Sequence, residues 1–253
     1  MRTVLITGAS SGIGAACAEV LAAEGNYRIL VCARRKEKLD DLVTLIKNKY
    51  PQTDVYSFLL DVRNKVDVFN AIESLPTEWK NIDILINNAG LSQGLDAIQD
   101  GDTDDWDRMI DTNVKGFLYV SKAVIPALKQ SNNAHIINLG SIAGKEVYPN
   151  GNVYCASKHA VDALNKAMRI DLLPFNIKVT AINPGMVETE FSEVRFKGDK
   201  ERAKTVYNGL TPLSGQDIAE TISFILSRPA HVNINDILIM PTAQANGTVV
   251  NRK

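Results

Sequence analysis

The sequence lacks several features that define whole classes of proteins. It has only three cysteines, Cys17, Cys32 and Cys155, and their wide spacing fits neither a disulfide framework nor a Cys-x-x-Cys metal pair. Its three histidines share no metal-like spacing, so we expect no metal site. No apolar run approaches the ~20 residues that a membrane-spanning helix needs. The cysteines are therefore predicted to be small packing residues.

An excess of charge of one sign is also missing. The formal net charge is −1, from 28 basic and 29 acidic residues, so the chain offers no broad attraction for nucleic acid or an anionic membrane. The first strand-like run begins almost at Met1, which leaves no room for a secretion signal. We therefore expect a cytoplasmic protein with no nucleic-acid or membrane partner.

Short apolar runs alternate with helical patterns along the chain. The runs lie at 4–6, 29–32, 55–60, 82–86, 136–139, 179–182 and 237–240. Between them, apolar residues recur at helical spacing, as at Ile13, Cys17 and Val20. This alternation predicts one α/β domain over residues 1–253. We expect a Rossmann-type, doubly wound parallel sheet of about seven strands with helices on both faces.

Two long helices and two less regular segments complete the prediction. The helices are expected from Trp106 to Lys129 and from Tyr154 to Leu173, the second ending before Pro174. Aromatic, apolar and charged residues mix without clear periodicity after residue 184, so we expect a substrate lid at about 186–210, or else an ordinary packed loop. Residues 241–253 are expected to form a C-terminal arm, or a disordered polar tail.

A glycine-rich turn after the first apolar run is the most informative motif. It reads Thr7-Gly8-Ala9-Ser10-Ser11-Gly12-Ile13-Gly14, with glycine spacing different from the common Gly-x-Gly-x-x-Gly pattern. Glycines allow a tight turn and close approach of a phosphate, and free amides at a helix start favour an anion. The turn predicts a dinucleotide site, with contacts from Gly8, Ser10, Ser11, Gly12, Ile13 and Gly14. The alternative is a turn of this shape that binds no ligand.

A tyrosine and a lysine form a candidate proton-transfer pair. Tyr154 and Lys158 are four residues apart, which places them on one face of a helix. A free tyrosine has a pKa of ~10, and a nearby positive charge favours the phenolate. Lys158 is therefore expected to lower the pKa of Tyr154, which would act as a general acid or base. The alternative is a chance pair on a solvated helix face.

The end of the second apolar run bears on the choice of cofactor. An NAD-binding fold usually has an acidic residue there for the ribose hydroxyls, whereas this chain has Cys32-Ala33-Arg34-Arg35. An arginine can pair with a 2′-phosphate through two hydrogen bonds, so Arg34, helped by Arg35, predicts NADP. The alternative is that both arginines are solvated residues at the start of a helix.

Further motifs follow the predicted strand ends or lie on the long helices. In chain order they are Asn87-Asn88-Ala89-Gly90, Asn113, Ser141, Tyr154-Cys155-Ala156-Ser157-Lys158 and Pro184-Gly185. Open α/β sheets bind ligands at the carboxyl ends of their strands. Together with the glycine-rich turn, and in this order and spacing, these motifs resemble the short-chain dehydrogenase/reductase family across nearly the whole chain.

The resemblance implies a catalytic set and an oxidoreductase with a small-molecule substrate. Tyr154 would exchange the substrate hydroxyl proton, Ser141 would hydrogen-bond the carbonyl oxygen, and Lys158 would lower the phenol pKa and hold the nicotinamide ribose. Asn113 would support a water-linked proton relay. Asp61 would accept a hydrogen bond from the adenine amine. The remaining implied cofactor contacts are Val62, Asn87, Ala89, Gly90, Pro184, Gly185, Val187 and Thr189, together with Tyr154 and Lys158.

Longer stretches resemble one branch of this family, the NADP-dependent 3-hydroxy acid dehydrogenases. They include residues 138–144, 154–158, 184–192 and 240–245. That branch oxidises serine, allo-threonine and related 3-hydroxy acids, or reduces their semialdehydes. Such substrates carry a carboxylate close to the carbinol, so the pocket needs a cation or amide donors, and Arg195 is the candidate. The other expected substrate contacts are Ser141, Met186 and Glu188, the last for a substrate ammonium.

The resemblance also implies a homotetramer, with the C-terminal arm reaching a neighbouring subunit. Two alternatives remain open. One is a carbonyl reductase of small uncharged ketones or aldehydes, whose lid needs no charged partner. The other is a non-catalytic NADP-binding sensor, against which the intact Ser141, Tyr154 and Lys158 argue.

Overall fold

A single parallel sheet forms the centre of the molecule. The computed structural model describes residues 1–253 and contains seven strands in the order β3-β2-β1-β4-β5-β6-β7. The strands are β1 (Arg2–Thr7), β2 (Tyr27–Ala33), β3 (Val55–Leu59), β4 (Ile84–Asn87), β5 (His135–Leu139), β6 (Lys178–Pro184) and β7 (Asp236–Ile239). The predicted doubly wound sheet is confirmed. Its strand order reverses between β1 and β4, where folds of this kind bind ligands.

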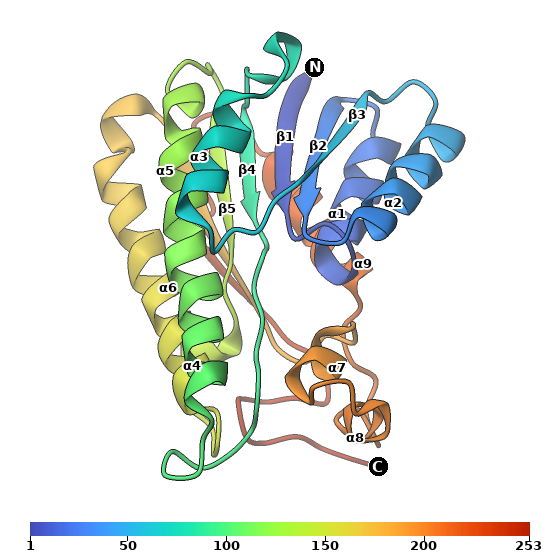
Figure 1. The fold of residues 1–253 in the computed structure, drawn as a ribbon, viewed down its shortest axis with the longest axis vertical. Helices are drawn as coiled ribbons and strands as arrows, with labels where there is room; N and C mark the ends of the chain where they lie inside the picture. The colour runs from blue at the N-terminus through green and yellow to red at the C-terminus, as the bar shows by residue number, and fades with distance from the viewer.

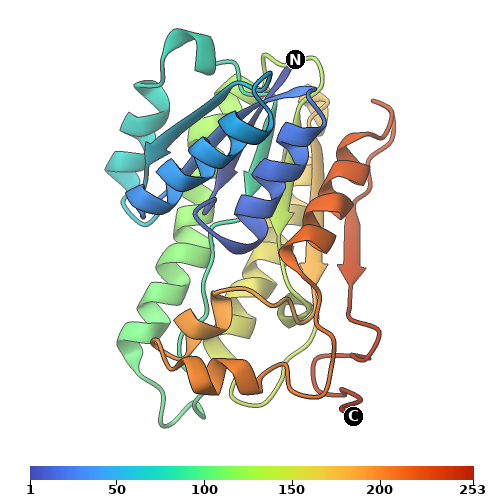
Figure 2. The same ribbon diagram turned by 90° about the vertical axis from the view of Figure 1, so that its right-hand side faces the viewer.

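Helices cover both faces of the sheet, as Figures 1 and 2 show. The helices α1, α2 and α9 lie on one face, and α3, α5 and α6 lie on the other. None of the helices is both long and apolar enough to cross a membrane. The bounds are α1 (Gly12–Ala23), α2 (Lys36–Lys49), α3 (Lys65–Glu73), α4 (Thr103–Ile110), α5 (Phe117–Leu128), α6 (Asn152–Asp171), α7 (Phe191–Arg195), α8 (Lys200–Thr205) and α9 (Gly215–Leu226).

Successive residues of the central strands pack into two different cores. Val4 and Ile6 of β1 belong to the core under α1, α2 and α9, whereas Leu5 belongs to the core under α3 and α5. Side chains of a strand alternate between faces, so a strand covered on both sides must be apolar throughout. The unbroken apolar runs in the sequence follow from this burial. The three cysteines are free thiols buried in the structure, as expected for packing residues.

The helix expected from Trp106 to Lys129 has an irregular middle. The chain forms α4, then a π-helical segment at Asp111–Gly116, and then α5. A π-helical insertion adds a residue to the turn and re-aims the side chains that follow it, which is frequent at functional sites. Asn113 lies in this segment. Sequence periodicity identifies the long helix but does not resolve one extra residue within a turn.

The segment expected as a lid contains the two short helices α7 and α8. Both lie beyond the carboxyl ends of the strands, and the C-terminal residues run beside them (Figures 1 and 2). The arm folds onto its own chain: the Gln244 side chain accepts a hydrogen bond from the Met186 amide at 2.8 Å, and the Lys253 amide donates to the Gly209 carbonyl at 2.9 Å. The arm is therefore ordered against the lid, and its contact with a neighbouring subunit stays a prediction.

A buried histidine on β5 makes the fold sensitive to acid. The Nε2 atom of His135 lies 2.8 Å from the Thr180 hydroxyl, which itself donates to the Ile234 carbonyl, while Nδ1 has no partner. The imidazole is therefore neutral with its proton on Nε2. Burial, assisted by the positive charges of Lys178 and Arg2, lowers the pKa of His135 to about 3.

We expect stability to fall as the pH drops below about 6.5, the unfolded-state pKa of histidine. Between that value and the folded pKa of about 3, the unfolded chain binds the additional proton. The free energy of unfolding should therefore decrease by at most about 1.4 kcal/mol per pH unit from this residue. Urea unfolding of the wild type and of His135→Gln at pH 7, 6, 5 and 4 measures the effect. Parallel pH profiles for the two proteins would contradict it.

Candidate active site

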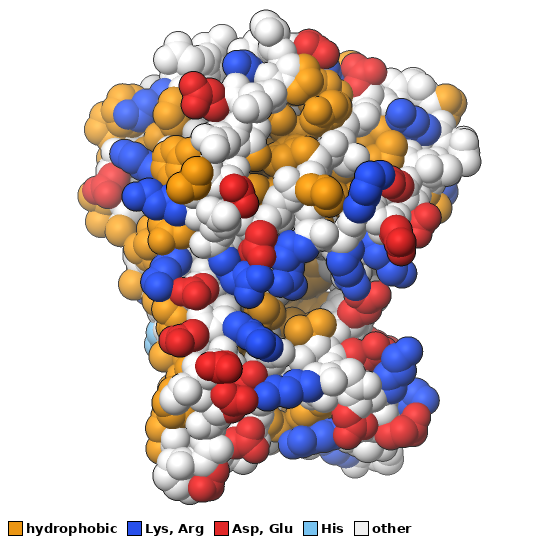
Figure 3. All heavy atoms as spheres, viewed as in Figure 1, with side chains coloured by type: hydrophobic (Ala, Val, Ile, Leu, Met, Phe, Trp, Pro, Cys, Tyr) orange, Lys and Arg blue, Asp and Glu red, His pale blue; other side chains and the backbone are white.

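A cleft of about 400 Å³ opens at the carboxyl ends of the central strands. On the face seen in Figure 3, lysine and arginine side chains gather around a hollow at mid-height of the molecule. Most residues predicted to bind the cofactor or substrate line this one cleft. They are Gly8, Ser10, Ser11, Gly12, Ile13, Arg34, Arg35, Asp61, Val62, Ala89, Gly90, Ser141, Tyr154, Lys158, Pro184, Gly185, Val187 and Thr189.

Six predicted residues do not line the cleft, and several that do were not predicted. The six are Gly14, Asn87, Asn113, Met186, Glu188 and Arg195. The residues that sequence reasoning missed include Asn88, Leu91, Thr112, Gly140, Glu190, Phe191 and Val194. The lid residues among them come from α7 and its start, where no sequence periodicity indicated a helix.

The glycine-rich turn adopts a backbone that requires glycine. Gly8 and Gly12 have positive φ angles of 67° and 56°, and a Cβ atom at Gly12 would lie 3.2 Å from the Thr189 side chain. Ser11 precedes α1, but no side chain caps this helix and its first turn contains no acidic residue. The amides at the start of α1 are therefore available to an anionic group in the cleft.

Asn88 lines the cleft, whereas Asn87 does not. The Asn88 side chain donates to the carbonyls of Thr7 and Gly8 at 2.9 and 3.1 Å, which fastens the glycine-rich turn to the end of β4. The Asn87 side chain lies on the opposite side and donates to Ser121 and Asn138 at 2.9 and 3.0 Å. Neighbouring residues of a strand point to opposite faces, which explains the difference.

The side chains of the two arginines after β2 differ in their contacts. Arg35 donates to the hydroxyls of Ser10 and Ser11 and forms an ion pair with Glu190 at 2.8 Å. Arg34 lines the cleft and makes no hydrogen bond or ion pair within the chain. A guanidinium without a partner beside the cleft fits a phosphate group.

Asp61, the residue expected to meet the adenine amine, has a partner in the structure. Its carboxylate accepts hydrogen bonds from the Arg63 guanidinium at 3.0 and 3.1 Å. These hydrogen bonds hold the pKa of Asp61 below its usual value, although partial burial raises it. Asp61 nevertheless lines the cleft, so its acceptor role toward adenine stays a prediction.

Tyr154 lies at the inner end of the cleft in a strongly buried position. Burial raises its pKa above the usual value, the neighbouring phenol of Tyr148 adds to this effect, and Arg195 and the Ser141 hydroxyl oppose it. The phenol ring also packs edge-on against Phe191, with ring centres 5.7 Å apart. The Ser141 hydroxyl and the Tyr154 phenol are therefore neighbours, as the catalytic assignment requires.

Lys158 is bound to the backbone, and its expected effect on the Tyr154 pKa stays a prediction. The Nζ atom of Lys158 donates to the Leu139 carbonyl at 2.8 Å, and the cation that lowers the Tyr154 pKa is Arg195. Burial lowers the pKa of Lys158 itself to about 8. Helical spacing predicts that two residues share a face, but it does not predict that a carbonyl lies within reach of the ammonium.

Asn113 is held tightly beside this cluster. Its Oδ1 accepts from the Leu91 amide at 2.9 Å, and its Nδ2 donates to the Leu91 carbonyl and to the Ser157 hydroxyl at 2.8 and 3.0 Å. The side chain is only 2% exposed. It therefore joins the π-helical segment to α6 and to the loop after β4, and its part in a proton relay stays a prediction.

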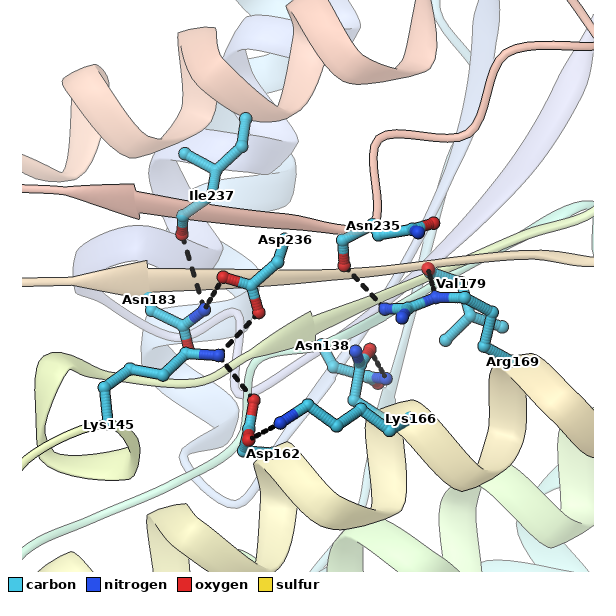
Figure 4. A network of polar contacts seen from close by, with 11 residues as sticks. Asn138, Lys145, Asp162, Lys166, Arg169, Val179, Asn183, Asn235, Asp236 and Ile237 are labelled. Atoms are coloured by element: carbon cyan, nitrogen blue, oxygen red, sulfur yellow. Dashed lines mark hydrogen bonds and ion pairs between the residues drawn. The ribbon is translucent and has the colours of Figure 1, made fainter.

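A polar network behind the cleft braces the turn that carries Ser141 (Figure 4). Lys145, at the end of that turn, contacts Asp162 of α6 at 2.6 Å and Asp236 of β7 at 2.7 Å. Asp162 also binds Lys166, and Asp236 accepts from Asn183 of β6 at 3.2 Å. The partly buried charges of this network tie the Ser141 turn to the helix that carries Tyr154.

Arg195 packs against the aromatic rings at the inner end of the cleft. Its guanidinium carbon lies 5.3 Å from the ring centres of both Tyr154 and Phe191. Its Nε donates to Ser92 at 3.0 Å and its Nη2 to the Tyr148 hydroxyl at 2.9 Å. No carboxylate pairs with it. Arg195 is thus a half-buried cation held by neutral groups.

The other two expected substrate residues are placed less favourably. Met186 uses its backbone to bind Gln244 and Leu213. Glu188 has an exposed side chain, and its amide donates to the Leu213 carbonyl at 2.8 Å. Neither side chain lines the cleft.

The residues of the cleft fit a dinucleotide that carries a 2′-phosphate. The open amides of α1 and the close glycine turn fit a pyrophosphate, and the unpaired Arg34 fits a further phosphate. The Thr112 hydroxyl adds a buried polar atom without a partner on the same cleft. Buried polar atoms normally have a hydrogen-bond partner, so this hydroxyl marks a position where a ligand can contribute one.

The sheet order, the open turn and the Ser-Tyr-Lys cluster define a dinucleotide-binding α/β protein. A family model described as short chain dehydrogenase matches residues 2–200, and the chain belongs to this family.

Three similar proteins agree with the family. The chain is 42% identical over 252 residues to the NADP-dependent 3-hydroxy acid dehydrogenase of Schizosaccharomyces pombe, covering 100% of this chain and 97% of that protein. It is 42% identical over 243 residues to sulfoacetaldehyde reductase 2 of Chromohalobacter salexigens, covering 96% and 95%. A solved structure of serine dehydrogenase, in its closed form with NADP+, is 40% identical with a TM-score of 0.91 and 100% coverage of both chains.

Proposed function

We propose that this protein is an NADP-dependent oxidoreductase that interconverts a small 3-hydroxy acid and its carbonyl form. The observation that carries this proposal is the convergence of Ser141, Tyr154, Lys158 and Arg34 on one cleft. Full-length similarity to the yeast enzyme supports the same reaction and cofactor, and so does the likeness to the NADP+-bound serine dehydrogenase.

When bound in the cleft, NADP+ would supply the acceptor for the hydride that leaves the carbinol carbon. The alcohol also loses a proton, which Tyr154 takes up as general base and returns as general acid in the reverse direction. Ser141 donates a hydrogen bond to the oxygen on which charge develops. Lys158, held at the Leu139 carbonyl beside Tyr154, would bind the ribose and add positive charge near the phenol.

The substrate class follows from the cation that packs against two aromatic rings lining the cleft. Arg195 lies over the Tyr154 ring and has no carboxylate partner within the chain. A 3-hydroxy acid carries its anion two carbons from the carbinol carbon, so one end can reach Tyr154 while the other reaches Arg195. A carbonyl reductase of uncharged ketones needs no such cation, and the observed position of Arg195 favours the acid.

A sulfonated aldehyde is the second candidate substrate. The relative in Chromohalobacter salexigens is named for sulfoacetaldehyde, in which a sulfonate takes the place of the carboxylate and is separated from the carbonyl carbon by the same single carbon atom. A guanidinium can pair with either anion. The shared requirement is therefore a small anion beside the reacting carbon.

We also infer a cytoplasmic homotetramer. Large apolar side chains remain exposed on the surface of α5 and α6 and just after α6: Leu118, Ile170, Leu173 and Phe175. Large exposed apolar side chains on one side of a protein support an interface with other subunits. The family resemblance of the sequence supports four as the number of subunits.

The test is steady-state turnover by the purified protein with NADP+ and with NAD+. The alcohols are L-serine, L-allo-threonine, 3-hydroxyisobutyrate, 3-hydroxypropionate, isethionate and an uncharged secondary alcohol. We expect turnover with NADP+ and the carboxylates. Activity confined to isethionate would establish the sulfonate candidate, and activity confined to the uncharged alcohol would contradict both.

A further inference from the structure

Arg35 and Glu190 join two parts of the cleft that are far apart in the sequence. Arg35 follows β2, whereas Glu190 immediately precedes α7 in the lid. The Nη1 atom of Arg35 lies 2.8 Å from a Glu190 carboxylate oxygen. Its Nε and Nη2 atoms donate to Ser10 and Ser11 at 3.2, 3.0 and 2.7 Å. All three nitrogens of this guanidinium therefore have a partner in the protein.

This arrangement places a negative charge beside the two arginines of the cleft. Glu190 lines the cleft together with Arg34 and Arg35. Although burial raises the pKa of Glu190, the Arg35 guanidinium and the Ser11 hydroxyl lower it below the usual value. The carboxylate is therefore ionised at neutral pH. The glycine-rich turn contributes two hydroxyls to the same cluster, so the cation, the carboxylate and the phosphate-binding turn meet at one point.

The ion pair is weak enough for a ligand to replace it. The side chains of Arg35 and Glu190 are 47% and 39% exposed, and exposed ion pairs contribute little because water and salt screen them. A phosphate dianion offers more charge and more acceptor oxygens than one carboxylate. Arg34 has no partner, so it can bind the same phosphate without breaking a contact.

We propose that Glu190 is a specificity-determining residue of the cofactor site, because its carboxylate competes with a 2′-phosphate for Arg35. The inference rests on the proposed use of NADP. A dinucleotide without a 2′-phosphate leaves the Arg35–Glu190 pair intact. Its affinity therefore does not increase when the charge of Glu190 is removed. Glu190 thus reduces a preference for NADP that Arg34 and Arg35 create, and its charge sets how large that preference is.

The test measures binding, without turnover, for Glu190→Gln. This substitution keeps the size and hydrogen-bonding capacity of the side chain and removes its charge. Isothermal titration would use NADP+ and NAD+, with adenosine 2′,5′-bisphosphate and adenosine 5′-monophosphate as probes that lack the nicotinamide. We expect the variant to bind NADP+ and the bisphosphate on the order of fivefold more tightly. NAD+ and the monophosphate should change by less than about twofold.

Glu193→Gln is the matched control, because Glu193 lies on α7, the short helix that Glu190 immediately precedes, and makes no ion pair. It should leave all four dissociation constants unchanged. In an Arg35→Gln background, the gain in NADP+ affinity from Glu190→Gln should largely disappear, because Glu190 then has no Arg35 guanidinium to hold away from the 2′-phosphate.

Several outcomes would overturn the inference. They are unchanged or weaker NADP+ binding by Glu190→Gln, and an equal gain for NADP+ and NAD+. In either case a wild-type preference for NADP+ would leave the proposed function standing. A selective gain for the 2′-phosphates in a protein that binds both dinucleotides equally would support the inference and contradict the proposed cofactor. A wild type that binds no dinucleotide would contradict both.

Discussion

Replacing Tyr154 with phenylalanine is expected to lower kcat by about 10²–10⁴-fold, the usual cost of losing a proton-transfer group. The ring should keep its place, because it packs against Phe191 and under Arg195. The dissociation constant of NADP+ should therefore change little. Stopped-flow measurement of hydride transfer, together with titration of NADP+, separates the two quantities.

Tyr148→Phe is the matched control, because it removes a second phenol that packs against Tyr154. We expect its kcat to stay within about tenfold of the wild type, since Tyr148 contacts no reacting atom in the proposed mechanism. The same ranking should hold at every pH. Equal losses in the two variants would show that the rate depends on packing in this cluster and would remove Tyr154 from proton transfer.

The fold was predictable because the sequence signals that indicate it are local. Runs such as Val4–Ile6 must be apolar throughout, since β1 is covered on both faces. The glycine-rich turn was also predictable, because the positive φ angles of Gly8 and Gly12 exclude most other residues. Burial and a positive φ angle each restrict the residue type at a single position, so they can be recognised in a single sequence.

The less predictable features depend on contacts between distant segments. No pattern near Glu190 indicates that it meets Arg35, which is 155 positions earlier in the numbering. Which of Asn87 and Asn88 lines the cleft depends on where β4 ends, because Asn87 is its last residue and Asn88 follows it. Likewise, the carbonyl that binds Lys158 comes from Leu139 of β5. These contacts appear only when the chain is folded.

Replacing Arg195 with methionine is expected to raise KM for a 3-hydroxy acid by about 10–100-fold, because hydrogen bonds to a charged group contribute on the order of 1.5–3 kcal/mol. Methionine keeps an unbranched apolar chain against Tyr154 and Phe191 while removing the charge. KM for an uncharged secondary alcohol should change much less. The measurement is steady-state kinetics on both substrates with saturating NADP+.

The loss of Arg195 should also affect the acid–base step, because its charge lowers the pKa of Tyr154 in the free protein. Without it, the pH at which the alcohol-oxidation rate rises should shift upward, since the phenolate becomes harder to form. Arg202→Met is the control, as Arg202 also stacks on a lid aromatic, 4.3 Å from the Phe196 ring centre, but on the exposed helix α8. A uniform loss on charged and uncharged alcohols in Arg195→Met, with no shift of the pH profile, would assign Arg195 to holding the lid through Ser92 and Tyr148. The anion of the substrate would then have to be recognised by other groups.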